Sequence, residues 1–467
     1  MKTVWVRMVL GCGVGLWALT ALGGDLTEAE VKRGAMNDAA DQLHLRQKTR
    51  FVVEHSDAFL KVPDKYAADT SFDRARVAPV VKLQILPDLK PEYFESTNQY
   101  MACWANWAHV ARSDDNRFFM AASDHLARGC DINVYEYAPG SPAIRKRIDV
   151  DQLLGWKRDQ YTDGKLHGHM GIVSNRVLWG ATHFGVMPDE SWYAAGYKGS
   201  WLFSYDLQTG QGKNWGSPLP RNSLSCFAVD ARRGVLVATG EMGGFLCWDC
   251  NAHRVMFAGP PPNGWRWWAR AMLLDESTGL FWGMDHSEKP YRFLSYDPAK
   301  NQFQRYEVPV PAGADAAAAT ELRGYTPRPA LDGFYYWATL GGNLFKFKPG
   351  PTPVVEPAGT TWDKGRDTLQ LALAPGGRYV YYFAKGDPTP VVQLDVKTGR
   401  KKALCWLQDF FFQKYGYAMG ESYGLNISTD GSFLVACMNG EFAKNRANNF
   451  GHPSGLVIEI PPEERVE

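Results

Sequence analysis

From about residue 100 onward, short apolar runs alternate with tight polar turns, and this pattern recurs seven times along the chain. In each copy, an apolar run leads into a turn rich in Asp, Asn and Gly, and a second apolar run follows, which is typical of a β-hairpin. The seven predicted hairpins occupy residues 108–121, 170–180, 226–238, 271–283, 329–338, 369–383 and 425–437. Successive hairpins without intervening helical periodicity predict an all-β protein.

A second element follows each hairpin: a short strand that ends in a polar turn, as in Tyr205-Asp206 and Tyr296-Asp297. Successive copies lie roughly 43 to 70 residues apart, which is the length of a four-stranded propeller blade with variable loops. We therefore predict a seven-bladed β-propeller over residues 96–467. The periodicity alone also fits six or eight blades, because ring closure distorts the first and last units.

The residues before the repeat divide into two segments. Residues 1–24 carry Lys2 and Arg7, an apolar run and the small residues Ala21 and Gly23, which predicts a secretory signal peptide and a periplasmic or secreted protein. Residues 25–95 predict a short N-terminal helical and extended segment packed on the outside of the propeller. No other stretch is long enough to span a bilayer, so we expect no membrane association of the mature form.

Composition and charge exclude several classes. The 467 residues carry a formal charge of +1, with 45% hydrophobic and 22% charged residues, so nucleic acid is not an expected partner and we expect a monomer. The 17 Trp, 21 Tyr, 24 Phe and 46 Gly are mostly material for strands and turns. The cysteines are scattered, and the pair Cys247 and Cys250 lies in a predicted strand, which favours a buried structural role.

Histidine is the informative residue type. In a propeller, the residues just before the first strand and just after the second strand of each blade line one central funnel. The spacings from His109 to His125, from His167 to His183 and from Arg270 to His286 are each 16 residues, as expected for the two ends of one hairpin. Six of the ten histidines occupy such positions: His109, His125, His167, His169, His183 and His286.

Arginine and aromatic side chains join them at the funnel. Neutral imidazoles beside guanidiniums suit β-elimination from a uronic acid, in which Arg pairs with the C6 carboxylate while His and Tyr transfer protons. Arg366 is placed like the other arginines, before the turn of its hairpin. The predicted catalytic residues are His167, His169, His183, Arg270 and Tyr325, and the predicted substrate-binding residues are His109, His125, Arg266, Arg323, His286, Tyr423 and Trp268.

One hairpin carries a resemblance to a known family. The runs Asp163-Gly164-Lys165-Leu166-His167-Gly168-His169 and Ala181-Thr182-His183 resemble the His-to-Thr-His hairpin of seven-bladed propeller polysaccharide lyases, the ulvan lyases and rhamnose-glucuronate lyases. The resemblance implies that His167 or His169 and His183 belong to the site. Those families place a catalytic Tyr and a neutralising Arg at the ends of the next hairpin, where this chain has Ser225 and Glu241.

The sequence therefore predicts an exported lyase that acts on an acidic polysaccharide or oligosaccharide and requires no cofactor. An alternative is a metal-dependent propeller hydrolase or lactonase, in which Glu241, Asp285, Asn222 and Asn439 hold a divalent cation, Ca²⁺ or Zn²⁺. A non-catalytic glycan-binding propeller is a third possibility, since it needs only the aromatic faces. No P-loop, dinucleotide fingerprint, HExxH or GxSxG motif is present in the sequence.

Overall fold

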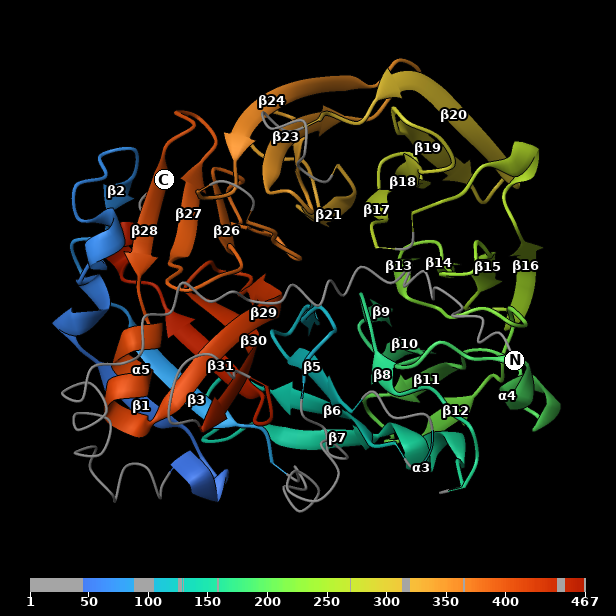
Figure 1. Ribbon diagram of the computed structural model, residues 1–467, viewed down its shortest axis with the longest axis horizontal. Coiled ribbons are helices and arrows are strands. Elements are labelled where there is room, and N and C mark those ends of the chain that lie inside the picture. The colour runs from blue at the N-terminus through green and yellow to red at the C-terminus, as the bar shows by residue number, and fades with distance from the viewer. Residues whose placement is uncertain are drawn as a thin grey trace, which may run out of the picture.

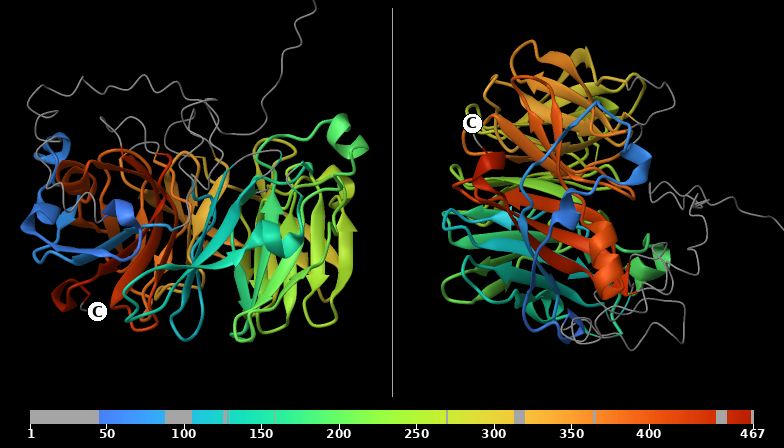
Figure 2. Two further views of the ribbon diagram at one scale, coloured as in Figure 1. Left: turned by 90° about the horizontal axis from the view of Figure 1, so that it is seen from below. Right: turned by 90° about the vertical axis from the view of Figure 1, so that its left-hand side faces the viewer.

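Seven β-sheets form a closed ring in the computed structural model, which describes residues 45–87, 105–124, 128, 130–157, 159–268, 270–312, 320–363, 366–442 and 450–465. Viewed down the ring axis, the sheets radiate from the centre like blades (Figure 1), and viewed from the side the ring is a thick disc (Figure 2). The prediction of an all-β, seven-bladed propeller is confirmed.

The first three blades run outward from the axis in chain order. Blade 1 contains β4 (Ala111–Arg112), β5 (Phe118–Ser123), β6 (Ile132–Tyr137) and β7 (Arg145–Asp149). Blade 2 contains β8 (Lys165–Leu166) and β9 (Gly171–Val173) on the inside, then β10 (Val177–His183), β11 (Leu202–Asp206) and β12 (Gly212–Asn214). Blade 3 contains β13 (Cys226–Asp230), β14 (Val235–Thr239), β15 (Phe245–Asp249) and β16 (Arg254–Gly259).

The next three blades repeat this order. Blade 4 contains β17 (Leu273–Asp275), β18 (Leu280–Asp285), β19 (Arg292–Asp297) and β20 (Gln302–Pro309). Blade 5 contains β21 (Leu322–Tyr325), β22 (Tyr335–Thr339), β23 (Asn343–Lys348) and β24 (Val354–Thr360). Blade 6 contains β25 (Ala372–Leu373), β26 (Tyr379–Phe383), β27 (Val391–Asp395) and β28 (Lys401–Cys405), with the short β2 (Asp73–Arg74) added parallel to β28.

Helices are few and lie between strands. The α-helices that lie wholly within the described ranges are α3 (Val150–Leu154), α4 (Glu190–Ala194) and α5 (Gln408–Tyr415), and the 3₁₀ turns there are η1 (Asp57–Leu60), η2 (Asp64–Tyr66), η4 (Pro262–Gly264) and η5 (Pro462–Glu464). No helix in the described ranges is long and apolar enough to cross a membrane.

Blade 7 closes the ring with strands from both ends of the chain. From the axis outward it contains β29 (Tyr417–Ile427), β30 (Phe433–Phe442), β31 (Ser454–Glu459), β3 (Val80–Ile85) and β1 (Val52–His55). β3 pairs with β31 along its whole length, from Val80 opposite Glu459 to Ile85 opposite Ser454. The expected boundary at residue 96 is therefore wrong: part of the 25–95 segment is propeller sheet rather than an external extension. Residues 1–24, the expected signal peptide, lie outside the described residues.

The turn chemistry explains why the hairpins were recognisable. Each of the seven hairpin turns between the first and second strands contains a residue with positive φ, an angle that Gly and Asn adopt most easily. These residues are Asn116, Asn175, Gly234, Gly279, Gly333, Gly377 and Gly431. The strand that follows the hairpin ends at an Asp in blades 2, 3, 4 and 6, and its carboxylate accepts hydrogen bonds from backbone N–H groups of the turn, as Asp206 does from Gln208 and Thr209.

The apolar core lies between neighbouring blades. Phe119 of blade 1 and Phe203 of blade 2 belong to one buried cluster, and Phe245 and Phe281 join blades 3 and 4 in another. The six described cysteines are buried and form no disulfide, which agrees with the structural role expected of Cys247 and Cys250. Because the blades pack through their faces, the inner ends of the strands remain available for polar side chains.

The closing strand should contribute strongly to stability. Leu83 on β3 is fully buried, so Leu83→Ala should lower the free energy of unfolding by about 2–5 kcal/mol. Chemical denaturation would measure this loss. Lys82→Ala, a change at the neighbouring and partly exposed position, is the control and should change stability by about 0.5 kcal/mol or less. Equal effects of the two substitutions would contradict the role of β3 in closing the ring.

Candidate functional site

The inner edge of blade 2 is interrupted by the segment from His167 to Met170. β8 pairs with the end of β10 and β9 with its beginning, while the residues between them leave this ladder. Gly168 instead bridges to Ala108 of blade 1, and its carbonyl accepts a hydrogen bond from His109 N at 2.8 Å. The interruption thus brings His167 and His169 to the axis, beside His109.

Gly168 is required by this geometry. Its φ is +75°, and a Cβ at this position would lie 2.8 Å from the carbonyl oxygen of Ser225 and 3.1 Å from Cys226 Cα in blade 3. Any side chain would therefore force the segment away from blade 3. The imidazole of His167 spans the same contact, because its Nδ1 donates to the Ser225 carbonyl at 2.8 Å. The segment from His167 to Met170 thus joins blades 1, 2 and 3 at the axis.

His109 and His169 form a pair of neutral imidazoles. His109 Nδ1 and His169 Nε2 are 2.7 Å apart, and the ring centroids are separated by 3.8 Å at an interplanar angle of 78°. Burial lowers the pKa of His169 to about 4. Burial, and then the neighbouring His169, lower the pKa of His109 well below its usual value. Both rings are therefore neutral at pH 7 and can each donate and accept a hydrogen bond.

His167 holds an arginine. Because its Nδ1 hydrogen is donated to Ser225, its Nε2 is the acceptor of the neutral ring, and the Arg270 guanidinium contacts it through Nη1. Burial is the largest cause that lowers the pKa of His167 well below its usual value, followed by the charges of Arg270 and Lys165. His167 therefore positions Arg270 and has no nitrogen left for substrate.

Arg270, Glu241 and His183 continue this chain of contacts. Arg270 Nη2 lies 2.9 Å from Glu241 Oε1, and His183 Nε2 lies 3.5 Å from the same oxygen. His183 Nδ1 is 2.7 Å from Ser223 Oγ, and the His183 side chain is fully buried. The two ends of the hairpin from His167 to His183 thus both help to position Arg270: His167 contacts its guanidinium, and His183 contacts its partner Glu241.

A second polar cluster lies on blades 5, 6 and 7. Lys385, just after β26, has its Nζ 3.6 Å from Asp367 Oδ2 and 3.2 Å from Glu421 Oε2. The same ammonium donates a hydrogen bond of 3.2 Å to Tyr423 Oη. Burial raises the pKa of Tyr423, and the charge of Lys385 opposes that rise. Tyr423 thus carries a proton at neutral pH beside a cation that stabilises its anionic form.

Arg323, on β21, lies between the two clusters. Its side chain is only 9% exposed, and its closest carboxylate oxygen, Asp367 Oδ2, is 3.8 Å from Nε. Neither Arg323 Nε nor either Asp367 carboxylate oxygen, all three of them buried, has a hydrogen-bond partner among the described residues. Burial is the largest cause that lowers the pKa of Arg323, and the charge of Arg270 lowers it further, which places both arginines in one electrostatic neighbourhood.

Aromatic rings flank this second cluster. Trp107 and Tyr423 have ring centroids 4.9 Å apart at an angle of 66°, and Lys165 Nζ lies 5.5 Å from the centroid of Trp107. His169 and Tyr423 are partly exposed, whereas His109, His167 and His183 are buried. Among these rings, His169 and Tyr423 are therefore the ones most accessible to a ligand.

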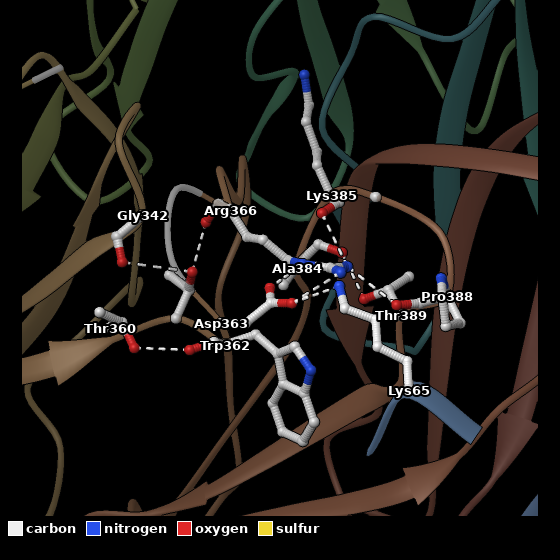
Figure 3. Close-up of polar contacts among 12 residues, drawn as sticks. Lys65, Gly342, Thr360, Trp362, Asp363, Arg366, Ala384, Lys385, Pro388 and Thr389 are labelled. Atoms are coloured by element: carbon white, nitrogen blue, oxygen red, sulfur yellow. Dashed lines mark hydrogen bonds and ion pairs between the residues drawn. The ribbon is translucent and has the colours of Figure 1, made fainter. Parts of the chain in front are cut away.

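Two predicted residues have other roles. Arg366 belongs to a separate network of polar contacts (Figure 3). Its guanidinium bonds to Asp363, Tyr66 and the carbonyls of Lys385 and Pro388. Figure 3 also shows the Lys385 side chain leaving this network in another direction. The Tyr325 hydroxyl donates to the carbonyl of Met272, and burial raises its pKa well above the usual value, so Tyr325 is poorly suited to the proton transfer predicted for it.

The remaining predicted residues lie at the rim or outside the description. Arg266 is exposed, while Trp268 and His286 are partly buried and in ring contact, with centroids 5.3 Å apart. His125 lies outside the described residues. The three acidic and basic residues that the prediction omitted, Asp367, Lys385 and Glu421, follow the same positional rule as the histidines. Lys385 in particular comes just after a second strand, so applying that rule to every ionisable residue would have found it.

The oxygen ligands of the metal-dependent alternative are engaged elsewhere. Asn439 Oδ1 accepts from the backbone of Asn106, and Asn222 Oδ1 accepts from that of Gly244. Asp285 accepts from Arg266 N and from Arg305. Within the part of the chain that the structure describes, no group of three or more His, Cys, Asp or Glu side chains has an arrangement suited to a metal ion.

Comparison with known proteins shows no family for this chain. No protein-family model and no curated protein matches this chain. Among solved structures, it is similar to one described as "Crystal structure of RRP9 WD40 repeats", with a TM-score of 0.47, 11% identity and coverage of 77% of this chain and 95% of the other. A second, described as "Structure of U3-55K", has the same TM-score and identity and covers 76% and 95%. The propeller assignment therefore rests on the seven sheets themselves.

Replacing Gly168 tests the junction of blades 1, 2 and 3. Gly140 is the matched control, because its φ is +78° but nothing lies within 4 Å of a Cβ there. Gly140→Ala should lower the free energy of unfolding by about 1 kcal/mol through backbone strain alone. Gly168→Ala should lower it by at least about 2 kcal/mol more, because the added methyl group meets blade 3. Equal decreases in the free energy of unfolding for the two variants would show that the close approach of Gly168 to Ser225 does not contribute to stability.

The neutral His169 predicts how stability depends on pH. Its folded-state pKa of about 4 lies below the usual 6.5, so the unfolded state binds more protons between these values. Stability is thus fully present above pH 6.5 and decreases as the pH falls toward 4. Denaturation at several pH values should show a smaller decrease over this window for His169→Gln than for the wild type. A steeper decrease in the variant would contradict a neutral, buried His169.

Proposed function

We propose that this protein is a polysaccharide lyase that cleaves a uronic-acid-containing glycan by β-elimination in the propeller funnel. One observation carries the proposal: Arg323 Nε is buried without a hydrogen-bond partner among the described residues, in the electrostatic neighbourhood of Lys385, Tyr423 and the neutral His167. A buried guanidinium with free N–H groups is matched best by a planar anion such as a carboxylate.

The elimination needs three functions. A cation must pair with the C6 carboxylate so that the hydrogen on C5 becomes acidic, and a base must take that proton. The C5–H electron pair then forms the C4–C5 double bond, the bond from C4 to the glycosidic oxygen breaks, and that oxygen receives a proton. No redox partner is consumed.

The described residues can supply each function. Arg323 pairs with the carboxylate, and Arg270, held by His167 and Glu241, adds a second positive charge nearby. Tyr423, which carries a proton at neutral pH, is the donor to the leaving oxygen, because Lys385 Nζ, 3.2 Å from its hydroxyl oxygen, stabilises the phenolate that remains. His169, neutral and partly exposed, is the candidate base that takes the proton from C5, and proton exchange with solvent afterwards restores both His169 and Tyr423. His183 supports Glu241 and is assigned a positioning role.

This assignment alters the predicted roles of several residues. His167, His183 and Tyr325 act through other groups, whereas Arg323 and Tyr423, first taken as substrate-binding residues, become the central pair. The same proposal includes export to the periplasm or medium, because polymeric substrates are most often found outside the cell. It also includes a monomeric state and independence of cofactors.

The direct test is to incubate the purified protein with a panel of uronate glycans and follow the ultraviolet absorbance of the unsaturated product. Arg323→Gln should lower kcat/KM by about 100-fold or more, because removing one donor that stabilises charge in the transition state has an effect of that size in other enzymes. Arg378→Gln, at the opposite end of β26, removes a guanidinium that pairs with Asp395 and should leave kcat/KM unchanged. Release of reducing ends without absorbance would favour a hydrolase, and binding without cleavage would favour a glycan-binding propeller.

A further inference from the structure

Three side chains lie together at the rim of the funnel between blades 4 and 5: Trp268, His286 and Glu321. Trp268 lies two residues before Arg270, and Glu321 lies two residues before Arg323. The inner strands of these blades, β17 and β21, are neighbours around the axis (Figure 1). The three residues thus form a tier adjacent to the two arginines of the proposed site.

Hydrogen bonds fix the position of this tier. Trp268 Nε1 donates to the carbonyl of Leu322 in blade 5 at 3.1 Å, so the indole spans the two blades. The backbone N–H of His286 donates to the carbonyl of Arg266 at 2.9 Å, which holds His286 beside the Trp268 segment. The two rings meet edge to face, with centroids 5.3 Å apart at an angle of 80°. The indole is partly buried and presents a rigid aromatic surface.

Two polar atoms of this tier are buried without a partner. His286 Nδ1 and Glu321 Oε2 have no hydrogen-bond partner among the described residues. Buried polar atoms are normally hydrogen-bonded, and those that lack a partner destabilise the fold until a ligand supplies one. A carboxylate can only accept, and a neutral imidazole can donate or accept, so a hydroxyl group satisfies both.

The charges of the tier restrict what can bind there. Burial, and then the charge of the exposed Arg266, lower the pKa of His286, so the ring is neutral at pH 7, and the charges of Asp285 and Glu321 oppose that shift without reversing it. The carboxylate of Glu321 would repel a second carboxylate or a sulfate group. Hydroxyl groups and a flat aromatic surface are instead the partners of an uncharged sugar ring.

We propose that Trp268, His286 and Glu321 form a subsite for an uncharged sugar adjacent to the uronate bound at Arg323. The proposal rests on the proposed lyase function and deepens it: the substrate is a glycan in which the uronate has a neutral neighbour, and polyuronates are disfavoured. Glu321 is the specificity-determining residue, and Trp268 supplies stacking.

The test uses two synthetic tetrasaccharides that differ in one sugar next to a glucuronate, either glucose or a second glucuronate. Calorimetry gives Kd, and product absorbance gives kcat/KM. The wild type should favour the glucose compound by about tenfold or more, since like charges in a site disfavour binding strongly. Glu321→Gln should reduce that preference to about threefold or less, because it removes the charge and keeps the shape.

Glu356→Gln is the matched control. Glu356 lies on the outer strand β24 of the same blade and pairs with Lys346 at the surface, so this variant should retain the full preference. Trp268→Ala should weaken the binding of both compounds by about tenfold through lost stacking.

The outcomes separate this inference from the proposed function. Preferential binding of the glucose compound that depends on Glu321, without any cleavage, would support the subsite and overturn the lyase. Cleavage of both compounds with equal kcat/KM, or an unchanged preference in Glu321→Gln, would overturn the subsite and leave the lyase intact. Failure of the wild type to bind either tetrasaccharide would overturn the subsite as well.

Discussion

The pairing of β3 with β31 is the interaction on which the rest of the molecule depends. Six backbone positions join a strand near the N-terminus to the last strand of the chain and convert an open row of blades into a ring. Only in a closed ring do the inner strands of all blades face one axis. The polar cluster draws on blades 1 to 7, so a loosened seam would separate Tyr423, in the closing blade, from Arg323 in blade 5.

Burial of charge is the second constraint. The axis holds Arg270, Arg323 and Lys385 close to Glu241, Asp367 and Glu421, so most positive charges are balanced by a carboxylate at 2.9–3.8 Å. His109, His167 and His169 are kept neutral by burial and therefore add hydrogen-bonding capacity without adding charge. Arg323 and Asp367 are the exception, since they approach each other without a hydrogen bond. Such an under-satisfied pair is typical of a site that a ligand completes.

Local chemistry explains how much of this architecture could be predicted from the sequence. The hairpins were recognisable because Asp and Gly turns such as Asp230 to Gly234 are encoded by adjacent residues. The closing pair β3 and β31 was missed because its partners lie more than 360 residues apart and no local signal joins them. The strand-end rule correctly brought His109, His167, His169 and His183 together, since it follows from the topology of every blade.

Roles within the site were harder to predict than positions. Arg366 occupies the same kind of position as Arg323, but it pairs with Asp363, three residues earlier in the same loop, and with Tyr66 of the N-terminal segment. The sequence likewise gives no sign that the Met272 carbonyl accepts a hydrogen bond from the Tyr325 hydroxyl. Which ionisable group is engaged and which is available depends on contacts between blades.

The central claim is that Arg323 recognises a carboxylate, and calorimetry with a uronate oligosaccharide and its methyl ester tests it most directly. The ester keeps the sugar hydroxyls and removes the negative charge. We predict that the wild type binds the free acid about tenfold or more tightly than the ester, and that this difference disappears in Arg323→Gln. Equal affinity of the wild type for the acid and the ester would contradict the account.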